Sequence, residues 1–217
     1  MSQKIDKKMS ENKRMKRDVE LDIEEDDRAI EHKKINYQGI KGLGFMEEFI
    51  TKEEENELLQ KIDNSEWDNS ISRRTQHYGY IYDYKSKEAA QVTKPIPTWC
   101  QFVIDRLIEK NIISYIPDQL IINEYIPGQG IYPHVDNVKF FEDGIVSVSL
   151  ASGIIMDFID TKNPANKKEI WLERRSVLAL HRDARYFWRH GITARKMDKK
   201  MFRGRRVSLT FRKMKFD

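Results

Sequence analysis

Two stretches in the first half of the chain place apolar residues at the three- and four-residue spacing of a helix. In residues 51–63, "TKEEENELLQKID", Thr51 and Glu54 form the capping-box pattern that starts a helix, and an apolar stripe follows at Leu58, Leu59 and Ile62. Residues 97–111, "PTWCQFVIDRLIEKN", begin at a proline and show one apolar side, made of Trp99, Phe102, Val103, Leu107 and Ile108. Both stretches are predicted to be amphipathic helices.

Beyond Pro117 the apolar positions recur with a period of two instead. Short runs rich in β-branched and aromatic residues, separated by Gly, Pro, Asn and Asp, lie at 119–126, 144–152, 154–160, 169–181 and 205–215. Within 144–152, one face carries Val146, Val148 and Leu150, and the other carries Ser147 and Ser149. The pattern predicts a mainly β (α+β) fold, a sandwich or barrel-like domain with the two helices covering one face.

Residues 1–34 follow neither pattern. They carry ten basic and ten acidic side chains and no Phe, Trp or Tyr, which predicts a charged, disordered arm ahead of one folded domain at 35–217. Within the arm, "KRMKR" at 13–17 is a candidate nuclear address.

Cysteine content and hydropathy narrow the class of protein. Cys100 is the only cysteine, which excludes an internal disulfide and a Cys-based zinc cage and favours an intracellular location, cytoplasmic or also nuclear. No apolar run approaches the roughly 18 residues of a membrane span, and the N-terminus has no hydrophobic stretch of a signal peptide. No membrane partner is therefore expected.

Candidate metal chemistry lies in "NEYIPGQGIYPHVDN", residues 123–137. His134 and Asp136 project from the same face of an extended chain, where an imidazole and a carboxylate can hold a divalent metal with a third, distant ligand. With His32 in the arm, the remaining histidines are His77, His181 and His190. His190, in "YFWRHGI", lies 56 residues after His134, a separation that lets a jelly roll return it on a facing strand.

A second His-x-Asp, "HRD" at 181–183, imitates the catalytic loop of protein kinases. That loop needs an Asn five residues after the Asp, but position 188 is Trp, and the chain has no glycine-rich loop, so a kinase is excluded. If His181 and Asp183 bound a metal, His190 would follow Asp183 by only seven residues and would lie on an adjoining turn instead of a facing strand. We therefore interpret "HRD" as a corner between a strand and a loop.

The last run, "RRVSLTFRK", places Arg206, Ser208, Thr210 and Arg212 on one face. Arginines that point inward are costly unless they meet anions, and a guanidinium binds a carboxylate through two parallel hydrogen bonds. A dicarboxylate cosubstrate would satisfy both. The wider block 189–215 holds eleven Lys or Arg against one acid, Asp198, and indicates either a solvated face or a phosphate-binding surface.

Taken together, these motifs resemble the AlkB family of iron(II)- and 2-oxoglutarate-dependent dioxygenases. The resemblance spans about residues 39–215 and rests on Asn123-x-Tyr125-x-Pro127-Gly128, His134-x-Asp136, His190-Gly191-Ile192 and Arg206-x-Ser208-x-Thr210-Phe211-Arg212. The sequences of the segments "RRTQHYGYIYDY", "FEDGIVSVSL" and "RYFWRHGI" are most similar to the AlkB-like domain of eukaryotic tRNA wobble-uridine hydroxylases.

The resemblance implies a double-stranded β-helix (jelly roll) and a set of cofactors. Fe(II) would be bound by His134, Asp136 and His190, leaving positions for a chelating oxo-acid and O₂. The cosubstrate 2-oxoglutarate would be bound by Asn123, Tyr125 and Arg206, with Arg206 on its far carboxylate and Ser208 and Arg212 assisting. The implied reaction is the hydroxylation of a C–H bond.

The same resemblance implies a nucleic-acid partner, tRNA, with a modified wobble uridine as substrate. Segment 72–84 would form part of a lid, in which Arg73, Arg74, His77, Tyr78 and Tyr80 contact phosphates and bases. The similar hydroxylases carry an RNA-recognition module and a methyltransferase, and this chain has room for neither. Delivery is therefore expected from the arm, the basic block or a separate partner, such as a tRNA methyltransferase or an adaptor protein.

Two alternatives stay open. One is oxidative demethylation of alkylated DNA or RNA, although repair-type members place an acid four positions after the first ligand, where this chain has Val138. The other is a non-enzymatic β-sandwich module that binds RNA or protein. Replacement of any one of the three predicted metal ligands would favour this module, but the sequence has His134, Asp136 and His190 at all three positions.

Overall fold

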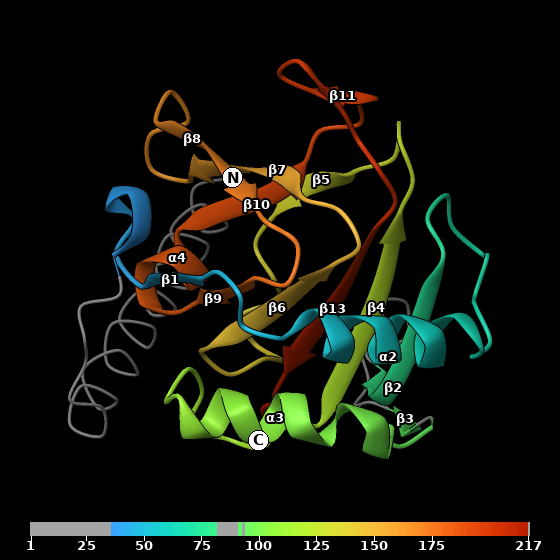
Figure 1. The fold of residues 1–217 in the computed structure, drawn as a ribbon. Helices are drawn as coiled ribbons and strands as arrows, with labels where there is room; N and C mark the ends of the chain where they lie inside the picture. Colours follow the sequence, from blue (N-terminus) through green and yellow to red (C-terminus); the bar gives the residue numbers. More distant parts are fainter. Residues whose placement is uncertain (1–35, 82–90, 93, 217) are drawn as a thin grey trace, which may run out of the picture. The chain divides into compact units, whose positions relative to one another are not determined.

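The computed structural model describes residues 36–81, 91–92 and 94–216, and most strands in this part form two antiparallel sheets (Figure 1). The larger sheet has the order β1 (Leu43–Met46), β9 (Val177–Leu180), β6 (Ile145–Leu150), β13 (Arg206–Arg212), β4 (Gln119–Tyr125), β2 (Thr75–Ile81) and β3 (Gln91–Val92). The smaller has the order β5 (Ile131–His134), β10 (Trp188–Ile192), β7 (Ile154–Asp160) and β8 (Lys167–Leu172). A hairpin of β11 (Met197–Asp198) and β12 (Met201–Phe202) stands apart from both.

The chain crosses between the two sheets as it proceeds, and this makes the fold a jelly roll. From β4 it passes to β5 in the smaller sheet, to β6 in the larger, to β7 and β8, and then to β9, β10 and β13. A core of apolar residues from both sheets, including Ile145, Phe158 and Leu178, fills the space between them. The predicted mainly β class and the predicted jelly roll are confirmed.

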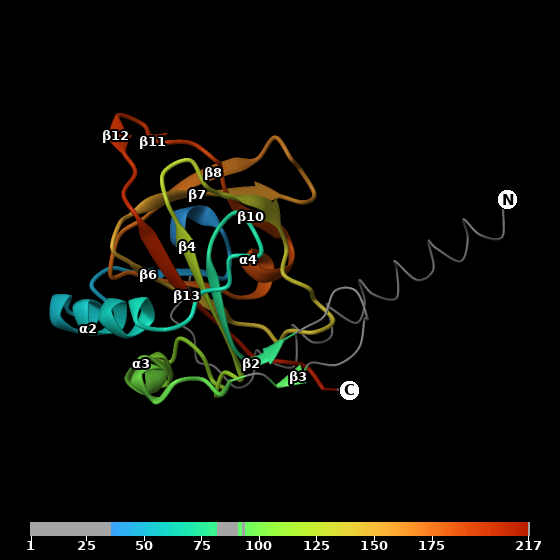
Figure 2. The same cartoon turned by 90° about the vertical axis from the view of Figure 1, so that its right-hand side faces the viewer.

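Both predicted helices are present and cover the outer face of the larger sheet (Figure 2). The first is α2 (Lys52–Asp63), whose capping box is complete: the Thr51 hydroxyl accepts from the Glu54 amide at 3.2 Å, and the Glu54 carboxylate accepts from the Thr51 amide at 2.8 Å. The second is shorter than predicted, because a 3₁₀ turn, η2 (Thr98–Cys100), precedes α3 (Gln101–Glu109).

The predicted strand runs at 119–126, 144–152, 154–160 and 205–215 contain β4, β6, β7 and β13. Run 169–181 contains two strand segments, because a turn in which the Ser176 amide donates to the Glu173 carbonyl separates the end of β8 from β9. The serine–valine alternation has the predicted effect: Val146, Val148 and Leu150 pack under the helices, while Ser147 and Ser149 face the space between the sheets.

Further elements of the described part are the short helix α4 (Arg182–Tyr186) after β9 and a 3₁₀ turn, η1 (Tyr37–Gly39), before β1. The predicted arm at 1–34 and the last part of the predicted lid, residues 82–84, lie outside the described residues. Among the helices that the structure describes, none has the length and apolar character needed to span a bilayer.

Candidate metal and cosubstrate site

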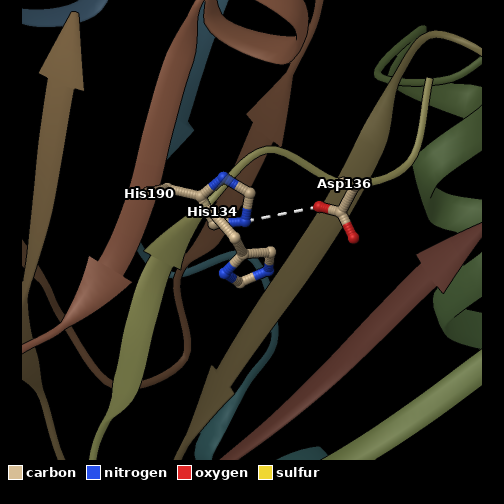
Figure 3. A group of neighbouring side chains, drawn as sticks. All are labelled: His134, Asp136 and His190. Carbon is tan, nitrogen blue, oxygen red and sulfur yellow. Dashed lines mark ion pairs between the residues drawn. The ribbon is translucent and has the colours of Figure 1, made fainter. Parts of the chain in front are cut away.

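The two histidines of the predicted triad face each other across neighbouring strands. His134 on β5 pairs directly with His190 on β10, and their ring centroids lie 4.7 Å apart. Asp136 follows the end of β5, and its Oδ2 lies 3.3 Å from His190 Nε2 (Figure 3). One ligand atom from each of the three residues lies within 4.8 Å of the others, which is a spacing that one metal ion can bridge. Two imidazoles and one carboxylate on one side of an ion match the donor set of non-haem Fe(II) sites.

Asp136 is held as a carboxylate. Burial alone would raise its pKa, but Arg212, whose Nη2 lies 2.6 Å from Oδ1, and the neighbouring His190 outweigh burial and hold the pKa well below its usual value. The backbone around Asp136 is also fixed, because the buried guanidinium of Arg185 on α4 donates to the carbonyls of Asp136, Asn137 and Phe141. Arg185 was missed in the sequence, where an arginine in a charged helical segment is typical of a solvated face.

His134 is oriented to bind through one nitrogen. Its Nδ1 lies 2.8 Å from the carbonyl oxygen of Tyr132, so this nitrogen carries the proton and Nε2 is left as the metal-facing atom. Burial, followed by the proximity of His190, lowers the pKa of His134 and favours the neutral form that metals bind. On the other histidine, Nδ1 of His190 is buried without a hydrogen-bond partner among the described residues. Neutral His134 and ionised Asp136 are the protonation states in which these side chains bind a metal ion.

A pocket between the sheets continues from the triad toward Arg206. Arg206 is 1% exposed, and burial lowers its pKa to about 10. Its Nη2 donates to the Ser149 hydroxyl at 2.9 Å, its guanidinium lies 5.5 Å from the Tyr125 ring centre, and its Nε has no partner in the described part of the chain. A buried guanidinium with so few acceptors is suited to an incoming carboxylate.

The other residues predicted to bind the cosubstrate line the same pocket: Asn123, Tyr125, Ser208 and Arg212. Their convergence follows from register, because β13 pairs with β4 so that Arg206 lies opposite Tyr125 and Ser208 opposite Asn123. Arg212 differs from Arg206 in already having acceptors, namely Asp136 and the Gln119 side chain, the latter at 3.0 Å. In this structure Arg212 therefore contacts the metal-binding carboxylate.

The residues predicted to touch RNA are placed in different surroundings. Arg73 donates to Asn123 Oδ1 at 3.0 Å at the pocket, whereas Arg74 forms a two-point ion pair with Glu124 at 2.6 and 2.7 Å. His77 is partly buried, with Nε2 3.1 Å from the Thr75 hydroxyl, and Tyr80 stacks edge-on against Phe216 at 5.0 Å.

Tyr78 requires a correction. Its ring is 7% exposed, belongs to the core under the helices and meets Trp99 edge-on at 6.5 Å, and its hydroxyl donates to Gln76 Oε1 at 3.1 Å. Because α2 and α3 cover this face of β2, Tyr78 contributes to the core and presents no free ring surface to a base.

"HRD" lies at the predicted corner. His181 follows the last residue of β9 and precedes α4, and Asp183 lies in the first turn of that helix. The Nδ1 atom of His181 is 3.8 Å from the Asp143 carboxylate. The grouping of potential metal-binding side chains in the described residues contains neither of them.

Gly191, beside His190, sets how closely β5 and β10 approach. A Cβ at this position would lie 2.8 Å from backbone atoms of Pro133 and 2.9 Å from the Ile131 carbonyl oxygen. Gly191→Ala is therefore expected to push β5 away from β10, separate His134 from His190 and reduce turnover about 100-fold, as misplacements of about 1 Å do. Gly39→Ala, where a Cβ meets nothing within 4 Å, is the control. The φ of +75° at Gly39 strains any side chain, so this variant should lose some thermal stability but keep its turnover. Equal turnover of the two variants in a 2-oxoglutarate consumption assay would contradict this account of Gly191.

Comparisons with known proteins agree with this geometry. Residues 42–212 match the 2OG-Fe(II) oxygenase superfamily. Protein L905 of Acanthamoeba polyphaga mimivirus is 37% identical over 180 residues, covering 81% of this chain and 86% of L905. The Mus musculus tRNA (carboxymethyluridine(34)-5-O)-methyltransferase ALKBH8 is 37% identical over 206 residues, covering 80% of this chain and 30% of ALKBH8. The chain thus spans under a third of that relative.

The structural comparison supports the fold. The solved structure of OsALKBH1 superposes with a TM-score of 0.60 at 17% identity, covering 79% of this chain and 96% of that one. The family match and these relatives also exclude the non-enzymatic binding module. The chain belongs to the 2OG-Fe(II) oxygenase superfamily and, within it, to the AlkB family of Fe(II)- and 2-oxoglutarate-dependent dioxygenases.

Proposed function

We propose that this dioxygenase hydroxylates a modified uridine at the wobble position of tRNA. The observation that carries the proposal is the similarity to ALKBH8 proteins, whose name refers to carboxymethyluridine at tRNA position 34 and which reach 42% identity over 169 residues in Macaca fascicularis. The segment compared with this relative covers 72% of this chain. The hydroxylated uridine would be passed to a methyltransferase, as a separate protein or bound through an adaptor.

In this proposal the triad holds the metal and the strand β13 holds the cosubstrate. His134, Asp136 and His190 bind Fe(II), which supplies the O₂-dependent oxidation of 2-oxoglutarate that is coupled to hydroxylation. Arg206 binds the far carboxylate of 2-oxoglutarate, and the polar groups of Asn123, Tyr125 and Ser208 line the path between. Apolar side chains from both sheets, among them Ile145, Met156 and Leu178, line the rest of this pocket.

Each residue near the metal has a distinct part in this arrangement. The Tyr132 carbonyl keeps the proton on Nδ1 of His134, so the opposite nitrogen is available as a ligand. Arg212 keeps Asp136 ionised, and its contact with Gln119 fixes the guanidinium on β4. Arg73, which donates to Asn123, connects the predicted lid to the cosubstrate pocket.

Oxidative demethylation is the competing activity within the family. A Caenorhabditis elegans DNA N6-methyl adenine demethylase is 29% identical over 180 residues. Val138, four positions after His134, offers no charge or hydrogen bond to an exocyclic amino group, which favours a uracil ring over an adenine.

Mass spectrometry of tRNA nucleosides from cells with and without the gene tests the proposal. We expect loss of the gene to accumulate the unhydroxylated wobble uridine, and re-expression of the wild type, but not of His134→Ala, to restore the hydroxylated form. Accumulation of an N-methylated base with unchanged wobble uridine would assign the enzyme to demethylation.

A further inference from the structure

The β11–β12 hairpin exposes an aromatic ring that the fold does not use. Phe202 is 81% exposed and Met201 54% exposed, and Lys196, Lys199 and Lys200 are exposed around them. Large apolar side chains are normally buried, so a Met and a Phe exposed side by side on β12 indicate a contact surface.

Hydrogen bonds from buried side chains anchor this hairpin to the rest of the fold. Asp198, 1% exposed, receives two hydrogen bonds of 2.8 Å from Arg203, one of 2.7 Å from Arg195 and one of 3.0 Å from the Ile155 amide. Arg203 also donates to the Thr193 carbonyl at 2.7 Å. The ring of Phe202 is therefore presented from a fixed backbone, which lowers the entropy lost when it binds a partner.

These ion pairs also change how the basic block 189–215 must be interpreted. Arg203 and Arg206 are buried, so neither is part of an outer phosphate-binding surface. Asp198, the one acidic side chain of residues 193–205, is buried among arginines. The outward charge of the hairpin is consequently positive and comes from its lysines.

The hairpin adjoins the rim of the pocket. The Gly128 amide donates to the Arg195 carbonyl at 3.2 Å, which ties the hairpin to the segment that leads into β5 (Figures 1 and 2). In that segment the Gln129 side chain donates to the carbonyl of Ser72, next to Arg73. A continuous rim thus runs from the hairpin through Gln129 to the arginine that contacts Asn123.

We propose that this hairpin binds unpaired nucleotides that flank the target base, with Phe202 stacking on a base and Lys199 and Lys200 neutralising phosphates. The inference rests on the proposed nucleic-acid substrate and extends it to a named contact surface. Unpaired strands expose both the π-faces of their bases and a dense row of phosphates, and a ring among lysines is complementary to both. A folded double strand offers no free base face to Phe202.

The test measures the affinity of the purified protein for a fluorescent 12-nucleotide oligo(U) RNA and for a 12-base-pair RNA duplex over a KCl series. Phe202→Ala should weaken oligo(U) binding about tenfold with an unchanged salt slope, since stacking contributes about 1–3 kcal/mol per base. Lys199→Ala/Lys200→Ala should reduce the slope of log K against log[salt] by about 1.4, because each phosphate contact on a single strand contributes about 0.7.

Matched controls lie outside the hairpin and the rim. Ile116, 70% exposed, precedes β4, whereas the hairpin adjoins the segment after β4, so Ile116→Ala removes an exposed apolar group far from the rim. Lys52→Ala/Lys110→Ala removes two exposed lysines at helix ends. Both controls should bind oligo(U) as the wild type does, and every variant should keep its melting temperature and its substrate-free consumption of 2-oxoglutarate.

Unchanged oligo(U) binding in Phe202→Ala, or an equal loss on the duplex, would overturn the proposal. So would a loss confined to binding of phosphatidylserine vesicles, which would make the hairpin a membrane contact. The outcome is separable from that for the proposed function: if the hairpin variants behave as expected but tRNA nucleosides are unchanged in cells, the surface stands and the wobble-uridine assignment fails.

Discussion

Replacement of His134 by alanine is expected to abolish 2-oxoglutarate turnover and to weaken Fe(II) binding by more than about 100-fold, since loss of even an outer-shell partner can cost that much. His134 is one of the three residues, with Asp136 and His190, whose potential ligand atoms lie within 4.8 Å of one another in the described part of the chain. No neighbouring side chain can replace it, because Arg212 and Arg185 occupy the other polar positions around Asp136. Titration of the anaerobic protein with Fe(II) and an oxygen-consumption assay measure the two effects.

His181→Ala is the matched control, because His181 belongs to the other His-x-Asp of the chain. Its ring packs next to Gly144 and lies 3.8 Å from Asp143, outside the triad. We expect this variant to bind Fe(II) and to turn over 2-oxoglutarate as the wild type does, with some loss of thermal stability. Undiminished turnover in His134→Ala, or its loss in His181→Ala alone, would show that the metal assignment is wrong.

Arg206→Ala is expected to raise the concentration of 2-oxoglutarate needed for half-maximal turnover by a large factor. Truncation of one partner of a buried charge pair costs about 2–5 kcal/mol, which corresponds to roughly 30- to 4000-fold in affinity. Arg206→Lys should recover only part of this, because an ammonium group cannot make two parallel hydrogen bonds to a carboxylate. The rise in melting temperature on adding 2-oxoglutarate should shrink in the same order, and this measurement does not depend on turnover.

The outcome for Arg206 can be told apart from general damage. Among the described residues, the Arg206 side chain donates one hydrogen bond, to Ser149, and contacts the Tyr125 ring, so its removal takes little from the free protein beyond packing. Arg206→Ala with unchanged affinity for 2-oxoglutarate would transfer the role to Arg212, the other arginine of β13 in the pocket.

Much of this architecture could be predicted from local patterns. The Thr51 capping box specified the start of α2, and strict alternation specified β6 and the inward face of β13. The triad was predicted because its two halves occur in motifs of fixed spacing. What spacing cannot give is the register that places His134 opposite His190, since it depends on the whole smaller sheet.

Local patterns fail for residues that were predicted to lie on the surface and are buried. Along β2, Gln76 and Tyr78 face α2 and α3, and Gly79, with φ of +76°, interrupts the alternation before Tyr80. Which face of β2 is covered depends on helices distant in sequence, so the buried ring of Tyr78 could not be distinguished from an exposed one. The same holds for Arg203, whose burial depends on pairing with Asp198.

Arg185 has a consequence for the metal-free protein. By donating to three carbonyls around Asp136, it holds the ligand-bearing loop in place with protein contacts alone. Metal binding then orders little additional chain, unlike small zinc domains, in which ion binding and folding are one event. A chelator should therefore inactivate this enzyme without unfolding it, lowering the melting temperature only by the lost metal-binding free energy. Re-addition of Fe(II) should restore activity without a refolding delay.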